Sequence, residues 1–258
     1  MFSINVHENF KFLLTQLNNI QENVRCSYAV ILNCNAYMYE QCTQYTFPNY
    51  IHIHPVILNK CRFHGSLTHG IFLNMQYALE HIQFEYFIVT SSRNFFENDM
   101  RIEDLNRIVE LESNGIEVIK HQQELYRNKK IHEINNLGWF PWMVQTPIFM
   151  QYMINHDHSF YHSPHEGLMF PKKDCLIVQQ FLDTRPEMKT DLFMEDTLTE
   201  DGQLTKEGYP VEEIALQTIV KSQKGKYYYI GNGCDVGQNG PNDFETGRLF
   251  FMYKTVRE

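Results

Sequence analysis

The sequence predicts an α/β fold with a parallel, doubly wound sheet flanked by helices. Apolar, strand-like runs alternate with stretches of helical periodicity through the first half of the chain, which is the pattern of βαβ units. The 258 residues are 43% hydrophobic, enough to bury one large core. Because the sequence contains no internal repeat and no linker that would divide it, we expect a single domain.

The first half supplies this alternation in order. Apolar runs predict strands at residues 2–6, 28–32, 50–54 and 85–90. Apolar residues at helical spacing, and acidic residues before the last segment, predict helices at residues 10–20, 67–82 and 102–112.

The second half is less regular. An apolar strand and helix extend to about residue 154, further helices are expected at residues 172–183 and 211–222, and closing strands at 226–230 and 249–253. The glycine-rich segment GNGCDVG, residues 231–237, is expected to be a turn.

Composition excludes several classes of function. The net charge of −9 argues against a non-specific nucleic-acid surface, which needs a cationic face. No apolar run is long enough to span a membrane, and the N-terminus does not resemble a signal peptide, so a cytoplasmic location is expected. Six cysteines without a CxxC pair indicate reduced thiols, not a disulfide framework or a zinc site.

Polar clusters follow three of the predicted strands, where open parallel sheets bind ligands. The clusters are Val6-His7-Glu8-Asn9, Asn33-Cys34-Asn35 and Ser91-Ser92-Arg93-Asn94. Each could be an ordinary strand-to-helix turn, since Asn and Ser are common N-caps. Three clusters at one predicted edge favour a pocket.

The absence of common nucleotide-binding motifs limits the ligands that such a pocket could bind. The sequence has neither GxxxxGK[ST] nor a GxGxxG after a strand, which argues against a P-loop or a dinucleotide site. No two aspartates are separated by a single residue, so the Asp-x-Asp pair that holds a cation at a sugar-nucleotide diphosphate is missing. Lysine or arginine would have to neutralise a bound diphosphate.

Two further segments carry titratable groups. The run HDHSFYHSPHE, residues 156–166, holds four histidines; a metal site and a solvated loop near an active site are both open, and we expect the loop. In YPVEEIALQTIV, Glu212 and Glu213 precede an amphipathic helix, where either dipole complementation or a general base would explain them.

Taken together, these segments resemble the core-2/I-branching β-1,6-N-acetylglucosaminyltransferase family, whose relatives include the protein xylosyltransferases. INVHEN resembles the Val-His ending of the family's first strand, and TSSRNFFEN stands where the family has Ser-Gly-x-Asp-Tyr-Pro. GWFPWMVQTPIFM resembles the Trp-Phe segment on the acceptor side. PVEEIALQTIV resembles the Pro-Asp-Glu helix that carries the catalytic base, and LFFMYKT the closing Lys-containing strand.

The resemblance implies a glycosyltransferase A-type fold with a mixed, Rossmann-like sheet, whose residues 1–115 bind the nucleotide and residues 116–258 bind the acceptor. It also implies inversion at the anomeric carbon, a UDP-sugar donor (GlcNAc or xylose), a glycan acceptor and no cofactor or divalent metal. The donor-binding positions are Val6, His7, Asn33, Asn35, Ser91, Asn94, Lys226 (or Lys224) and Lys254. The acceptor-side positions are Arg93, Trp139 and Trp142.

Two glutamates compete as the base. Glu213 lies in the segment that has the family's helical continuation, whereas Glu166, in SPHEGL, is followed by Pro171. Glu213 is therefore the expected base, and Glu212 is expected to be a solvent-facing cap. The alternatives are a catalytically inactive relative that binds glycans or partners, and a metal hydrolase built on the histidines of residues 156–166.

Overall fold

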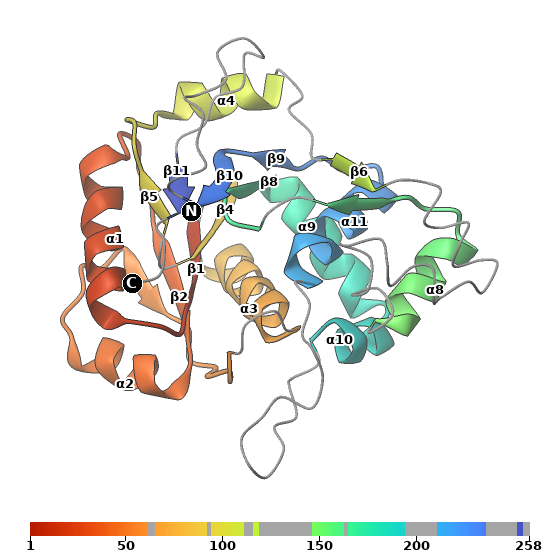
Figure 1. The fold of residues 1–258 in the computed structure, drawn as a ribbon, viewed down its shortest axis with the longest axis horizontal. Coiled ribbons are helices and arrows are strands. Elements are labelled where there is room, and N and C mark those ends of the chain that lie inside the picture. The colour runs from red at the N-terminus through yellow and green to blue at the C-terminus, as the bar shows by residue number, and fades with distance from the viewer. Residues whose placement is uncertain are drawn as a thin grey trace.

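The computed structural model describes residues 1–60, 65–91, 94–110, 116–118, 146–162, 165–193, 211–235 and 252–254 (Figure 1). Strands and helices alternate through the first half, as predicted. Their order is β1 (Phe2–Val6), α1 (Phe10–Asn23), β2 (Val30–Cys34), α2 (Ala36–Gln44), β3 (Ile51–Ile53), α3 (Gly65–His81) and β4 (Tyr86–Ser91).

The main sheet has six strands in the order β3-β2-β1-β4-β8-β9. The four strands from the first half pair in parallel. β8 (Leu168–Pro171) and β9 (Tyr228–Tyr229) are added antiparallel at one side. The sheet is therefore mixed and compatible with a Rossmann-like fold, and the second half of the chain extends the sheet that the first half begins.

The remaining elements surround this sheet. They are β5 (Asn94–Phe96), α4 (Ile102–Glu110), β6 (Ile116–Val118), α8 (Pro147–Asn155), β7 (Phe160–His162), α9 (Lys172–Asp183), α10 (Pro186–Leu192), η1 (Val211–Glu213), α11 (Ala215–Ser222), β10 (Gly231–Asp235) and β11 (Met252–Lys254). The expected turn at residues 231–237 is wrong for its first five residues, because β10 pairs with β11. β7 likewise occupies part of the expected loop at residues 156–166 and pairs with β6.

Helices cover both faces of the sheet (Figure 1). Side chains on one face of β1, such as Phe2 and Ile4, pack in a hydrophobic cluster with residues of α1 and α4. The other face packs against α3 and α9, and there the core includes Phe87 and Val89 of β4. Buried apolar runs are expected of strands covered on both sides.

The α3 side of β1 is polar despite being buried. Ser3 and Asn5 alternate with the apolar residues of the strand and are 0% and 4% exposed. Asn74 of α3 donates to the Ser3 hydroxyl over 3.0 Å, and the Asn5 amide donates to the Leu67 carbonyl over 3.0 Å. A buried polar row therefore runs beneath α3 and ends at the carboxyl edge of the sheet.

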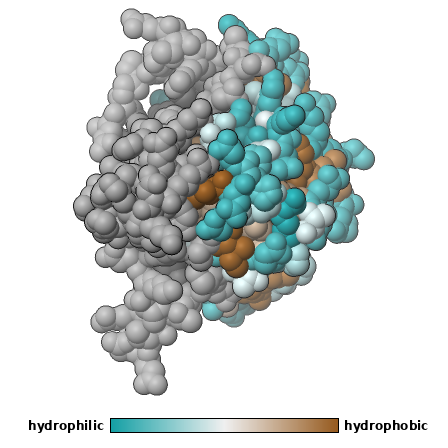
Figure 2. All heavy atoms as spheres, turned by 90° about the vertical axis from the view of Figure 1, so that its right-hand side faces the viewer, coloured by the Kyte–Doolittle hydropathy of each residue, from teal (hydrophilic) through white to brown (hydrophobic). Residues whose placement is uncertain are grey.

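Among the described residues on the right-hand side of the molecule in Figure 1, the exposed surface is mainly hydrophilic, with small separate apolar areas (Figure 2). Within the ranges given above, no helix combines the length and hydropathy that crossing a membrane requires.

Candidate active site

The polar ends of three neighbouring strands form one row. Asn5 of β1 lies opposite Asn33 of β2 on one side and Ser91 of β4 on the other. Residues opposite each other in a sheet point to the same face. The structure thus brings two of the predicted clusters together at the carboxyl edge, on the side that α3 covers.

Hydrogen bonds connect the end of the apolar strand β4 to Asn94. The backbone N–H and the hydroxyl of Ser91 both donate to Asn94 Oδ1, over 2.7 and 3.0 Å. Asn94, 3% exposed, then begins β5. Both predicted residues lie at the edge, and the oxygen of the Asn94 amide joins them.

The first cluster meets the second through backbone contacts. Asn35 N–H donates to the Val6 carbonyl over 3.1 Å, and the Asn35 amide donates to the His7 carbonyl over 3.2 Å. Asn35 Oδ1 also caps α2 by accepting from Met38 N–H. The Val6 side chain is fully buried in the core, so its backbone and His7, not its side chain, face the edge.

A glycine turn brings Glu166 to the same edge. Gly167 N–H donates to the Val89 carbonyl of β4 over 2.8 Å, which places the preceding residue beside the end of β4. Gly167 has φ of +100°, and a Cβ there would lie 2.5 Å from the Gly231 nitrogen. Glycine is required here because other residues rarely adopt this conformation and the space is occupied.

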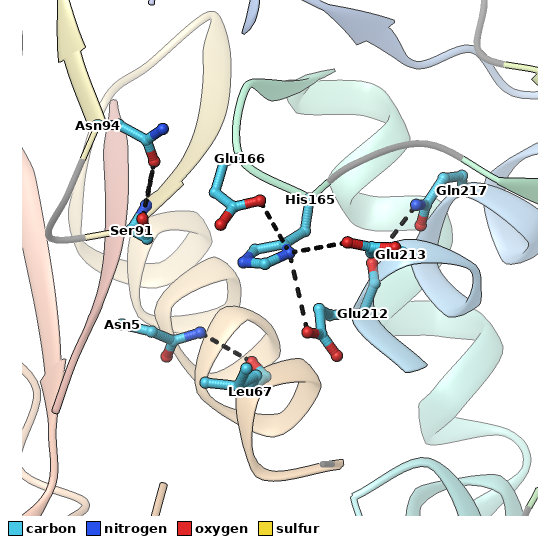
Figure 3. Close-up of polar contacts among 9 residues, drawn as sticks. All are labelled: Asn5, Leu67, Ser91, Asn94, His165, Glu166, Glu212, Glu213 and Gln217. Atoms are coloured by element: carbon cyan, nitrogen blue, oxygen red, sulfur yellow. Dashed lines mark hydrogen bonds and ion pairs between the residues drawn. The ribbon is translucent and has the colours of Figure 1, made fainter. Parts of the chain in front are cut away.

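Three glutamates converge on one histidine, as Figure 3 shows. His165 Nδ1 lies 3.2 Å from Glu166 Oε2, 3.8 Å from Glu212 Oε1 and 3.9 Å from Glu213 Oε1. We call these four residues the acid cluster. Two of its members come from the turn before β8 and two from η1, so the rival bases Glu166 and Glu213 share one site.

Burial and charge set the protonation of the acid cluster. Burial acts to lower the pKa of His165, but the three carboxylates, Glu166 foremost, raise it to about 9. Burial raises the pKa of Glu212 to about 8, against the opposing effect of His165. At neutral pH, His165 is therefore cationic and Glu212 holds its proton.

Exposure differs among the three glutamates. The Glu212 side chain is 1% exposed, Glu166 9% and Glu213 15%. The expectation of a solvent-facing Glu212 is wrong: η1 packs against α3, and that contact encloses the side chain. Glu212 Oε2 has no hydrogen-bond partner within the described part of the chain.

His165 was not singled out by its place in the sequence. It stood as one of four histidines in a polar run, and nothing local indicates that η1, far along the chain, contacts it. The usable signal was the adjacent Glu166. The other described histidines of that run lie elsewhere: His156 stacks on Tyr152 and His158.

His165, Glu166 and Glu213 also offer one donor atom each within 4.8 Å of one another. Imidazole nitrogen and carboxylate oxygen are ligands that divalent zinc and other transition metals accept. In the described ranges this is the group whose composition and spacing could hold a cation.

The two predicted lysines, Lys254 and Lys226, lie toward opposite edges of the sheet. β11 pairs antiparallel with β5 so that Lys254 lies opposite Asn94, at the candidate site. Lys226 precedes β9, and its backbone N–H donates to Asp174 of α9, toward the opposite edge of the sheet. Arg93, Trp139 and Trp142 lie outside the described residues.

A cavity of about 540 Å³ lies at the amino edge of the sheet, away from this chemistry. Its lining is mainly apolar and includes Met1, Phe2, Tyr28, Tyr86, Met100 and Leu105. We place the candidate site at the carboxyl edge because ligands of open α/β sheets bind there and because the titratable groups converge there.

No family model matches the chain, and no curated protein matches it.

Proposed function

We propose that the protein is an inverting glycosyltransferase that moves a sugar, GlcNAc or xylose, from a UDP-sugar to a glycan hydroxyl without a divalent metal. The observation that carries this proposal is the acid cluster at the carboxyl edge of the sheet, which lies beside the end of β4 and in line with the ends of β1 and β2. A nucleotide sugar bound across those ends would present its anomeric carbon near carboxylates able to accept a proton.

Glu213 suits the role of base best. It keeps the largest exposed fraction of the three glutamates, so an acceptor hydroxyl can reach it. Glu212 is buried and holds its proton, and Glu166 lies closest to His165. In this mechanism Glu213 takes the hydroxyl proton as the acceptor oxygen attacks the anomeric carbon from the face opposite the diphosphate, and the configuration inverts.

The donor would lie across the ends of the first strands. His7, Asn33 and Asn35 stand near the expected nucleoside, and Ser91 and Asn94 line the turn after β4. Lys254 lies opposite Asn94 in the β5–β11 pairing and in this proposal would stabilise the departing diphosphate.

A second candidate function is a metal-dependent hydrolase. The donor atoms of His165, Glu166 and Glu213 within 4.8 Å of one another favour it. In that case the cation would activate a water molecule, and the glutamates would be ligands, not bases.

The two candidates differ in a single assay. The protein is incubated in EDTA with UDP-sugars and oligosaccharide acceptors, and both the released UDP and the glycosylated product are quantified. Transfer that persists in chelator is the expected result, because no Asp-x-Asp pair is present to hold a cation at the diphosphate. Transfer that requires added Mn²⁺ or Zn²⁺ would contradict the metal-independent mechanism. Absence of transfer with donor still bound would indicate an inactive relative.

A further inference from the structure

Lys60 is a buried lysine at the carboxyl edge of β1 and β2. It is 8% exposed, and its Nζ donates to Asn5 Oδ1 over 2.6 Å. Burial lowers its pKa to about 7, against an opposing contribution from the neighbouring Cys34 thiol. Within the described ranges Lys60 has no carboxylate partner, although a buried ammonium ion is stable only when an anion or several hydrogen bonds compensate it.

The first two turns of α3 close over this ammonium group. A Cβ on Gly70 would collide with Lys60 Nζ and Asn5 Oδ1, so the helix backbone lies directly against them. Ser66 stands one helical turn before Gly70 and therefore faces the same way. Its hydroxyl is buried, at 1% exposure, and has no hydrogen-bond partner among the described residues.

Asn33 completes the surroundings of Lys60. Its Oδ1 would lie 2.8 Å from the same Gly70 Cβ, is fully buried and lacks a partner in the described part of the chain. An ammonium group has three N–H donors. Two can be directed at the amide oxygens of Asn5 and Asn33, and the third remains for a ligand, beside the Ser66 hydroxyl and the positive end of the α3 dipole.

Lys60 and the acid cluster lie toward opposite ends of one row of polar side chains. Asn33, Asn5 and Ser91 follow one another across three strands, and Glu166 lies beyond β4. Neighbouring strands are about 4.8 Å apart, so the three steps from Asn33 on β2 to Glu166 beyond β4 span roughly 14 Å. One end carries an ammonium group and the other carboxylates, which is the polarity that a departing anion and a deprotonated acceptor require.

We propose that Lys60, with Ser66 and the first turn of α3, binds the phosphoryl oxygens of the donor's diphosphate. This inference rests on the proposed function for the identity of the donor. Lys60 is thus a second cation for the leaving group, in addition to Lys254.

The test compares Lys60→Met with wild type by calorimetry, using UDP, uridine and inorganic diphosphate as probes. A charge-assisted hydrogen bond to phosphate corresponds to about tenfold or more in affinity. UDP and diphosphate should weaken by at least that factor, whereas uridine, which lacks phosphate, should bind as before. Lys173→Met, on the exposed side of α9, is the matched control and should change none of the three affinities.

Each outcome decides a different point. A folded Lys60→Met that binds UDP as tightly as wild type overturns the inference, as does an equal loss for uridine. If diphosphate binds in a Lys60-dependent way but UDP does not bind at all, the anion site is supported. The proposal that the donor is a UDP-sugar is then wrong. If wild type binds none of the probes, the anion site is wrong.

A second measurement applies should Lys60→Met not fold. In wild-type protein carrying ¹³C-labelled lysine, the Lys60 resonance is titrated with and without diphosphate. A bound anion favours the ammonium form and must raise the pKa of Lys60. An unchanged titration also overturns the proposal.

Discussion

Glu212 illustrates how burial decides the state of a single residue. Its neighbour Glu213 retains contact with solvent, whereas Glu212 is 1% exposed between η1 and α3. The pKa of Glu212, raised to about 8 by burial, exceeds its ordinary value of 4.5. The folded protein therefore binds a proton over this range that the unfolded chain releases, and this contribution to stability is complete below pH 4.5 and lost as pH rises through about 8.

Glu212→Gln removes that pH dependence while keeping the shape of the side chain. Relative to wild type, the melting temperature of Glu212→Gln should therefore rise between pH 4.5 and 8, by several degrees in order of magnitude. Thermal unfolding across this pH range measures the difference. Glu40→Gln, on the exposed side of α2, is the control. A difference between Glu212→Gln and wild type that does not vary with pH would mean that Glu212 is not buried as a neutral acid.

Among the elements, α3 connects the two ends of the site. Its first turn contacts Asn5 through the Leu67 carbonyl, and the helix packs against η1, which carries Glu212 and Glu213. Figure 3 shows these groups on neighbouring elements of one region. A shift of α3 would therefore disturb both the buried polar row and the acid cluster.

At Gly70 the backbone of α3 lies close against side chains of the sheet. In an exposed helix, Gly→Ala stabilises by about 1 kcal/mol. At Gly70 the added methyl group meets Asn5, Asn33 and Lys60, and overpacking of this kind costs about 1–3 kcal/mol. Gly70→Ala should consequently lower stability in chemical denaturation, whereas Glu80→Ala at an exposed position of the same helix should be nearly neutral. A Gly70→Ala variant more stable than wild type would contradict the close packing.

At the scale of the whole molecule, periodicity predicted the elements that depend on local sequence. Strands β1 to β4 and helices α1 and α3 follow it, and α9 has the expected bounds at Lys172–Asp183, whereas α2 at Ala36–Gln44 was not predicted. Strand β2 lies two residues later than expected, since the apolar run begins in the loop before it. The antiparallel addition of β8 and β9 was not visible in periodicity, because strand direction depends on contacts between distant segments.

The candidate site likewise contains residues whose place could be predicted from local sequence and residues whose place could not. Ser91, Asn94 and Asn35 follow strands, so their place at the carboxyl edge could be read from the chain. That Glu166 and Glu213 share His165 could not, because the contact joins the turn before β8 to η1. Lys60 was missed for a related reason: the burial of a lysine depends on α3 closing over it, and no local pattern marks that event.

In the proposed mechanism a carboxylate of the acid cluster removes the acceptor proton, and we propose that Glu213 is this carboxylate. The most direct test measures the rate of sugar transfer and the UDP-sugar affinity of Glu213→Gln and Glu166→Gln. Loss of a general base typically lowers the rate about 10²–10⁴-fold. We expect a loss of that size for Glu213→Gln with donor affinity unchanged, and a smaller loss for Glu166→Gln, which acts through His165. Transfer by Glu213→Gln at nearly the wild-type rate would contradict the account, and a full loss confined to Glu166→Gln would give the role to Glu166.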